Sequence, residues 1–199
     1  MGDVFMRNWL VGLALVAGLG SPAAASDDGK VQGLEDVNLL GLGPGTRYVL
    51  QIDDAGRVTV APAGAPQLSN LDQNVAKQIA DTYGDPEKLA EASGPNATMI
   101  DGGNAKAQPI PKDVIRVSFF ELTGSDGKSA TLLVFENGYD RALRYKASLI
   151  RGDKSAPTDV CTVLPHLRSY EQWPYPVDRI DLREFALIPY QAGTYPVCG

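Results

Sequence analysis

The sequence has little of what most catalytic and metal sites need. Its 199 residues include one histidine, His166, and two cysteines. A nucleophilic serine needs a base within hydrogen-bond reach, and the chain contains no Gly-x-Ser-x-Gly motif. A structural zinc site takes more nitrogen and sulfur ligands than these residues supply. We therefore expect no cofactor and no metal, and we interpret His166 as a surface or packing residue.

Two other patterns match catalytic motifs only in part. Ser125-Asp-Gly-Lys128 fits the Ser-x-x-Lys pattern of penicillin-interacting enzymes, but it lies in a glycine turn and the Ser-Asp-Asn and Lys-Thr-Gly companions are missing. Acid–base catalysis needs a desolvated carboxyl group. Asp53-Asp54 falls in a predicted exposed turn, and Asp178 and Asp181 neighbour arginines with which we expect ion pairs.

Positive charge is also scarce. The chain has 18 Lys and Arg against 24 Asp and Glu, a net charge of −6 and a pI near 4.8. Such a chain cannot replace the counterions of a nucleic acid, so we exclude a nucleic-acid partner. With 44% hydrophobic residues it can still bury a normal core. Its 21 glycines and 14 prolines favour a turn-rich β protein.

The first 25 residues have the pattern of a secretory signal peptide. An apolar run of 11 residues, 9–19, follows Arg7, and the small residues Ala23-Ala24-Ala25 suit cleavage after Ala25. The run is too short to span a hydrocarbon layer about 30 Å thick. We therefore expect a periplasmic or secreted protein with no stable membrane anchor after cleavage.

Export to an oxidising compartment would favour a disulfide between the two cysteines. In an oxidising compartment Cys161 and Cys198 form the one disulfide that the sequence allows. Cys198 is the penultimate residue, so the bond would attach the end of the chain to the strand that holds Cys161. On the chain-entropy model such a loop adds roughly 4 kcal/mol of stability.

Residues 26–110 contain a predicted hairpin, helical segments and a linker. Alternating apolar residues at 48–52 and 58–60 flank a turn at residues 53–56, which predicts a β-hairpin. A helix capped by Ser69 or Asn70 follows, with apolar residues spaced by four: Leu71, Val75, Ile79 and Tyr83. Asp85-Pro86 starts a second, shorter helical segment. Residues 96–111 show no periodicity, which predicts an exposed linker.

Residues 111–199 form the predicted β-sandwich domain. Residues 131–135 are apolar on both faces, which is typical of a strand buried between two layers. Residues 143–149 alternate apolar and polar, and Asn137-Gly138 between the two segments predicts a chain reversal through positive φ. We expect one buried cluster to contain Leu132, Val134, Leu143 and Tyr145. A break of phase between Leu182 and Phe185 predicts a β-bulge.

The fold class predicted for the whole chain is mainly β. About five strands in the C-terminal half, with no helix among them, indicate an immunoglobulin-like β-sandwich. The N-terminal half adds the β-hairpin and one or two short helices beside it. The Cys-Trp-Cys spacing of antibody domains is absent, so immunoglobulin-like describes the architecture alone.

Four short strings carry a resemblance to a group of proteins. They are Glu136-Asn-Gly-Tyr-Asp-Arg, Arg144-Tyr-Lys-Ala, Val160-Cys-Thr-Val-Leu-Pro and Glu171-Gln-Trp-Pro-Tyr-Pro. Over residues 114–188 the chain resembles exported proteobacterial proteins of uncharacterised function. The resemblance implies a bacterial exported protein and supplies no catalytic residue.

One aromatic segment is a candidate contact surface. Tyr170, Trp173 and Tyr175 lie within six residues, and Pro174 and Pro176 restrict the backbone around them. Rigid aromatic side chains could stack on a sugar ring or a partner protein at low entropic cost. The alternative, which we prefer, is that Trp173 closes one end of the sandwich.

The sequence favours an exported, non-enzymatic binding or scaffolding protein of the bacterial cell envelope, with an envelope protein or glycan as partner. Two alternatives stay open. One is an envelope hydrolase that acts on glycan or peptide through carboxylates, and a deep pocket with a perturbed carboxylate would favour it. The other is an inhibitor of a secreted or periplasmic enzyme, and a rigid protruding loop would favour that.

Overall fold

The computed structural model describes residues 35–83, 109–123, 127, 129–191, 193 and 197–199. The predicted signal peptide, the second helical segment, the linker and the Ser125–Lys128 motif lie outside the described residues or are only partly covered by them. Among the described residues, no helix combines the length and the apolar composition that a membrane crossing requires.

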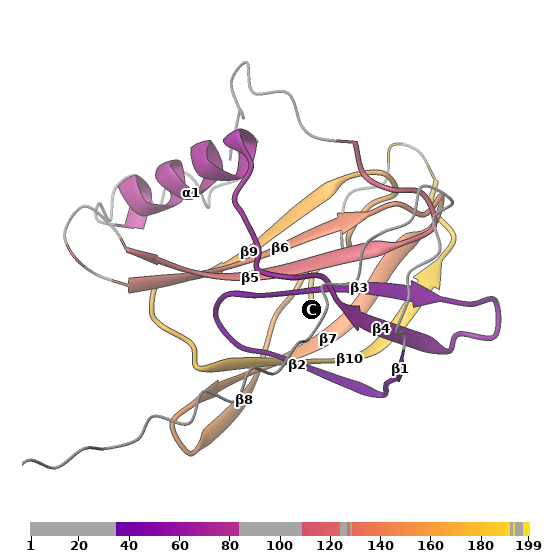
Figure 1. Cartoon of the computed structure of the whole chain (residues 1–199), viewed down its shortest axis with the longest axis horizontal. Coiled ribbons are helices and arrows are strands. Elements are labelled where there is room, and N and C mark those ends of the chain that lie inside the picture. Colours follow the sequence, from indigo (N-terminus) through magenta and orange to yellow (C-terminus); the bar gives the residue numbers. More distant parts are fainter. Residues whose placement is uncertain (1–34, 84–108, 124–126, 128, 192, 194–196) are drawn as a thin grey trace, which may run out of the picture.

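Two antiparallel sheets form the body of the protein, as the sequence predicts (Figure 1). The larger sheet has six strands in the order β1 (Glu35–Asp36), β4 (Val58–Pro62), β3 (Thr46–Ile52), β5 (Ile115–Thr123), β6 (Ser129–Asn137) and β9 (Arg168–Trp173). The smaller sheet has four strands in the order β2 (Leu39–Leu42), β10 (Arg179–Ile188), β7 (Ala142–Arg151) and β8 (Lys154–Thr158). One helix, α1 (Asn70–Tyr83), lies over the larger sheet.

The main hydrophobic core fills the space between the two sheets. Each inner face contributes the alternate residues of its strands, as expected for a sandwich. The largest of these side chains have no exposed surface: Leu42, Leu50, Ile115, Phe119, Leu133, Phe135, Leu143, Ile180 and Leu182.

Strand β6 is buried on both faces. Leu133 and Phe135 point into the main core, whereas Leu132 and Val134 point the other way and pack with Val75 of α1 in a second cluster. The prediction that Leu132 and Val134 share one cluster with residues of β7 is therefore wrong, although all four side chains are buried. The prediction fails because both faces of this strand are apolar, so its sequence does not indicate which face meets the other sheet.

Helix α1 begins where the sequence predicts. The Ser69 backbone N–H donates to Asp72 Oδ2 at 2.8 Å, and the Asp72 N–H donates to Ser69 Oγ at 3.1 Å. These reciprocal bonds form a capping box and satisfy two of the backbone groups that a helix start leaves open. The cap fixes the register in which Val75 faces the sheet.

Strands from both sides of residue 110 share the sheets and the core. The predicted hairpin, β3 with β4, is present, and β3 also pairs with β5 over five residue pairs. Strand β2 pairs with β10, near the other end of the chain. The N-terminal strands are therefore integral parts of the sandwich rather than an addition beside it.

The segment Asn137-Gly138 carries the chain from the larger sheet to the smaller one. The Asn137 side-chain amide donates to the carbonyl oxygens of Arg141 at 2.9 Å and Val163 at 3.1 Å. Gly138 is buried, and a Cβ on it would overlap the carbonyl oxygen of Pro111. The chain reversal is confirmed, but its reason differs from the prediction: Gly138 is needed for close approach of two backbone segments, and its φ lies outside the left-handed region.

The predicted bulge in β10 is present. The pairing of β10 with β7 shifts register between Arg183 and Ala186, and Glu184 within the bulge has a φ of 55°. The extra residue allows both Leu182 and Phe185 to be buried on the same strand.

Substituting Gly138 tests the close approach. We expect Gly138→Ala to destabilise the protein by about 3 kcal/mol or more, because the methyl group cannot be placed without moving backbone. Gly43→Ala is the matched control, because its Cβ would meet only the Asp178 carbonyl oxygen at 3.9 Å. Chemical denaturation of both variants measures the difference. Equal stability of the two variants would contradict the packing described for Gly138.

Candidate functional site

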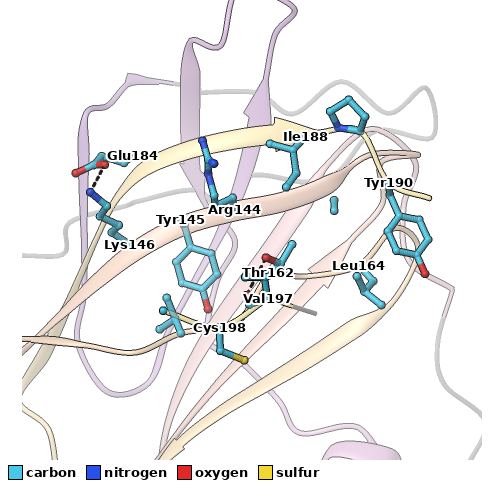
Figure 2. Close-up of a pocket in the computed structure, with 14 residues that line it drawn as sticks. Arg144, Tyr145, Lys146, Thr162, Leu164, Glu184, Ile188, Tyr190, Val197 and Cys198 are labelled. Carbon is cyan, nitrogen blue, oxygen red and sulfur yellow. Dashed lines mark hydrogen bonds and ion pairs between the residues drawn. The ribbon is translucent and has the colours of Figure 1, made fainter. Parts of the chain in front are cut away.

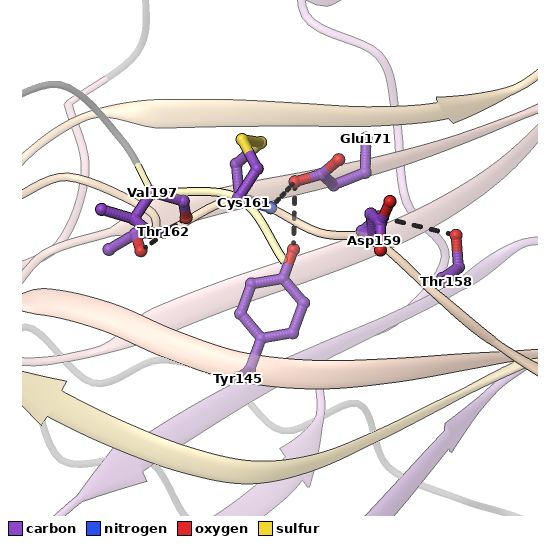
Figure 3. The surroundings of a disulfide bond; sticks show 8 residues. Tyr145, Thr158, Asp159, Cys161, Thr162, Glu171 and Val197 are labelled. Carbon is purple, nitrogen blue, oxygen red and sulfur yellow. Dashed lines mark hydrogen bonds between the residues drawn. A yellow bond between two sulfur atoms is a disulfide. The ribbon is translucent and has the colours of Figure 1, made fainter.

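The predicted disulfide joins Cys161 and Cys198, with 4.0 Å between their Cα atoms (Figure 3). Backbone hydrogen bonds join the same two segments on either side of the disulfide. The N–H of Thr162 donates to the Val197 carbonyl at 2.9 Å, and the N–H of Gly199 donates to the Val160 carbonyl at 3.2 Å. The end of the chain is thus held alongside residues 160–162 both covalently and by hydrogen bonds.

A half-buried carboxyl group lies directly beside the disulfide. Glu171 Oε1 accepts the Cys161 backbone N–H at 2.7 Å and the Tyr145 hydroxyl at 3.4 Å (Figure 3). Burial raises the pKa of Glu171, and these two hydrogen bonds oppose the rise. Burial also raises the pKa of Tyr145 well above its usual value. Since Glu171 lies on β9 and Tyr145 on β7, this contact ties the two sheets together next to the disulfide.

A groove of about 760 Å³ opens on the other side of Tyr145 (Figure 2). We call it the terminal groove, and it lies between β7, the end of β10, residues 160–164 and the last residues of the chain. Its walls combine charged side chains with an aliphatic surface. The aliphatic lining consists of Ala142, Val160, Leu164, Ile188, Pro189 and Val197.

Two cationic side chains, Arg144 and Lys146, line the terminal groove. Lys146 Nζ lies 2.7 Å from Glu184 Oε2, and this hydrogen bond lowers the pKa of Glu184. Arg144 also lines the groove, forms no ion pair within 4 Å among the described residues, and its charge helps to lower the pKa of Glu184. The groove therefore places a guanidinium group next to an aliphatic surface.

The predicted aromatic segment does not form a single surface. Trp173 is buried in the main core, and its indole N–H donates to Thr158 Oγ1 at 3.0 Å. Tyr170 packs against the second cluster and its hydroxyl donates to Asp72 Oδ1 at 2.9 Å, while the ring of Tyr175 lies 4.5 Å from the Arg151 guanidinium. Tyr170 and Trp173 are three residues apart on one strand and so point to opposite faces. The geometry of Trp173 fits the alternative in which it closes the sandwich.

The remaining candidates are engaged in local contacts. His166 is exposed, and its Nε2 lies 2.6 Å from Asp140 Oδ1. The expected pairing of Asp181 with an arginine is present, at 2.8 Å from Arg179. Asp178 instead accepts the Gly152 backbone N–H at 2.6 Å. Among the residues that the structure describes, no three His, Cys, Asp or Glu side chains lie close enough together to hold a metal ion.

Sequence reasoning did not find the terminal groove. The sequence pattern predicts only that Arg144 and Lys146 lie on the polar face of a strand. The groove exists because three segments distant in the sequence meet at one edge of the smaller sheet. The disulfide was the single sequence signal that placed two of these segments together.

Comparison with known proteins finds no matching family model, no matching curated protein and no matching solved structure. The site is therefore interpreted from its own chemistry.

Glu171 gives the stability of the protein a specific pH dependence. Burial raises the pKa of Glu171. At a pH between its usual pKa and this raised pKa, Glu171 is protonated in the folded protein and ionised in the unfolded chain. The free energy of unfolding then falls as the pH rises through this interval. Glu171→Gln removes this contribution, so we expect the wild-type protein to lose stability relative to the variant as pH increases.

Urea unfolding of both proteins over a pH series measures this trend. Glu184→Gln is a control of opposite sign, because Lys146 lowers the pKa of Glu184 and the wild type should gain stability relative to that variant as pH rises. The effect should be small, since Glu184 is exposed. A wild type that gains stability relative to Glu171→Gln with rising pH would contradict the burial of this carboxyl group.

Proposed function

We propose that the protein is an exported, non-enzymatic binding protein of the bacterial cell envelope. The signal-peptide pattern of residues 1–25 supports export, and so does the resemblance of residues 114–188 to exported proteobacterial proteins. The Cys161–Cys198 bond is consistent with an oxidising compartment, periplasmic or extracellular. We retain the immunoglobulin-like architecture as a prediction, since such sandwiches commonly present binding surfaces at their ends.

The proposed binding site is the terminal groove. The observation that carries this proposal is the combination, in one cavity of about 760 Å³, of an aliphatic wall with the guanidinium of Arg144, which forms no ion pair with the other residues that the structure describes. Ligand sites typically join apolar area with a few placed polar groups in a cavity of about this size. A matching occupant carries aliphatic side chains and one negative charge.

We assign this occupant as an extended, acidic segment of an envelope protein. The groove wall is mainly aliphatic, with Tyr190 as its one half-exposed aromatic ring. Alternating aliphatic and acidic side chains of a peptide would match this wall and Arg144, whereas sugar rings stack best on aromatic faces. Binding is favoured over the hydrolase alternative because Glu184, whose side-chain carboxylate lines the groove, is ion-paired with Lys146, and Glu171 does not line the groove.

The inhibitor alternative is the second candidate, because one hairpin protrudes from the body. Strands β7 and β8 extend beyond the rest of the smaller sheet (Figure 1), and the residues around their turn are exposed. The turn is braced, since the Gly152 N–H donates to Asp178 and the Arg151 guanidinium lies over Tyr175. A rigid, exposed hairpin is a suitable shape for occupying the active site of an enzyme.

One binding experiment separates the two candidates. A fluorescent peptide in which glutamate alternates with valine is titrated with protein, and a peptide with lysine in place of glutamate serves as reference. We expect preferential binding of the acidic peptide, and we expect Arg144→Gln to weaken it by about tenfold, the loss typical of one charge-assisted hydrogen bond.

Arg151→Gln is the matched control, since it removes the same charge from the other end of β7 in the protruding hairpin. It should leave the affinity unchanged. Binding that is lost in Arg151→Gln and retained in Arg144→Gln would reject the groove and favour the hairpin. Equal affinity for the acidic and basic peptides would reject an acidic occupant.

A further inference from the structure

The outer face of the larger sheet carries a row of charged side chains beneath the first turn of α1. Arg116 on β5, Glu136 on β6 and Arg168 on β9 are direct cross-strand neighbours, so a carboxylate lies between two guanidinium groups. Arg47 on β3 pairs with Ser118, which lies two residues beyond Arg116 on the same face of β5. We call this group, with Asp72 of α1, the arginine pocket.

Both carboxylates of the arginine pocket are already engaged. Glu136 lies 3.1 Å from Arg116 Nε and 2.5 Å from Arg168 Nη2 through its two oxygens. Asp72 accepts the Tyr170 hydroxyl at 2.9 Å and the Ser69 cap, and lies 4.0 Å from Arg168 Nε. Neither carboxylate is left to neutralise a third cation.

Arg47 is the cation without a counterion. Its Nε donates to Ser118 Oγ at 3.0 Å and its Nη2 to the Gln67 carbonyl at 3.3 Å, both of which are neutral acceptors. Among the described residues no carboxylate pairs with it. Three guanidinium groups thus face two carboxylates, which leaves one excess positive charge. Burial lowers the pKa of Arg116, and repulsion by the like charges of Arg47 and Arg168 lowers it further.

A small, partly open pocket adjoins these groups. A cavity of about 150 Å³ is lined by the three arginines, Ser118 and Glu136, with Leu68, Phe120 and Val134 as apolar walls. A water molecule occupies about 30 Å³ in the liquid, so the cavity has room for a small anionic group and not for an extended ligand.

We propose that the arginine pocket binds a small oxyanion, and that a carboxylate group matches its single excess charge. Arg47 and Arg116 would each present planar N–H donors suited to two carboxylate oxygens. The Ser118 hydroxyl, which accepts from Arg47, has its own proton to donate to the same anion. With the anion bound, the three guanidinium groups of the arginine pocket would face three negative groups: Glu136, Asp72 and the anion.

This site is independent of the proposed function, because the terminal groove is built on the smaller sheet and the arginine pocket on the larger one. Either can fail without affecting the other. The carboxylate could belong to a free organic acid or to a group on a larger partner. Acetate tests the shared chemistry, and an acetylated dipeptide with a free C-terminal carboxylate, compared with its amide, tests whether a group on a larger molecule can enter.

The experiment is a titration with sodium acetate followed by NMR of the arginine Nε–H signals, at constant ionic strength maintained with sodium chloride. We expect saturable shifts at Arg47 and Arg116, with a dissociation constant on the order of millimolar for so small a ligand. Arg47→Gln should weaken binding by about tenfold or more. Arg47→Lys keeps the charge but not the planar donors, so we expect it to bind with intermediate affinity.

Arg57→Gln is the matched control, because Arg57 is an exposed arginine at the other end of the same hairpin and pairs with Asp53. It should bind acetate as the wild type does. Equal binding by Arg47→Gln and the wild type, or the same shifts with chloride alone, would overturn the proposal. Tighter saturation by inorganic phosphate than by acetate would overturn the assignment of a carboxylate.

Discussion

Strand β6 contributes to both hydrophobic clusters of the protein. Leu133 and Phe135 reach into the space between the sheets, while Leu132 and Val134 hold the layer that contains α1. Burying both faces of one strand removes more apolar surface from water than an edge or surface strand can. It also fixes the register of the strand, since a slip by one residue would exchange its two faces.

Both proposed sites depend on the position of β6. Its hydrogen bonds to β9 and β5 align Arg168, Glu136 and Arg116 in the row that forms the arginine pocket. The pairing with β9 also brings Glu171 beneath the disulfide, where it meets Tyr145. At the end of β6, Asn137 and Gly138 direct the chain into the smaller sheet, and so set where Arg144 lies on β7.

Local patterns in the sequence predicted local structure well. The β3–β4 hairpin, the capped start of α1, the bulge in β10 and the disulfide each follow from a few neighbouring residues or from a single possible pairing. The sequence does not predict strand β9, because Arg168–Trp173 do not alternate apolar and polar residues. In the structure five of its six residues are half-buried. Two features depend on how strands distant in the sequence pair: which face of β6 meets the smaller sheet, and the row formed by Arg116, Glu136 and Arg168. A single sequence does not specify this pairing.

The central claim is that β6 is packed on both sides, and two neighbouring substitutions test it most directly. Leu132 and Leu133 are both fully buried but face different clusters. Leu132→Ala and Leu133→Ala should each lower the free energy of unfolding by about 2–5 kcal/mol, measured by chemical denaturation. A loss below about 0.5 kcal/mol for Leu132→Ala, with the full loss for Leu133→Ala, would contradict a packed layer between α1 and the larger sheet.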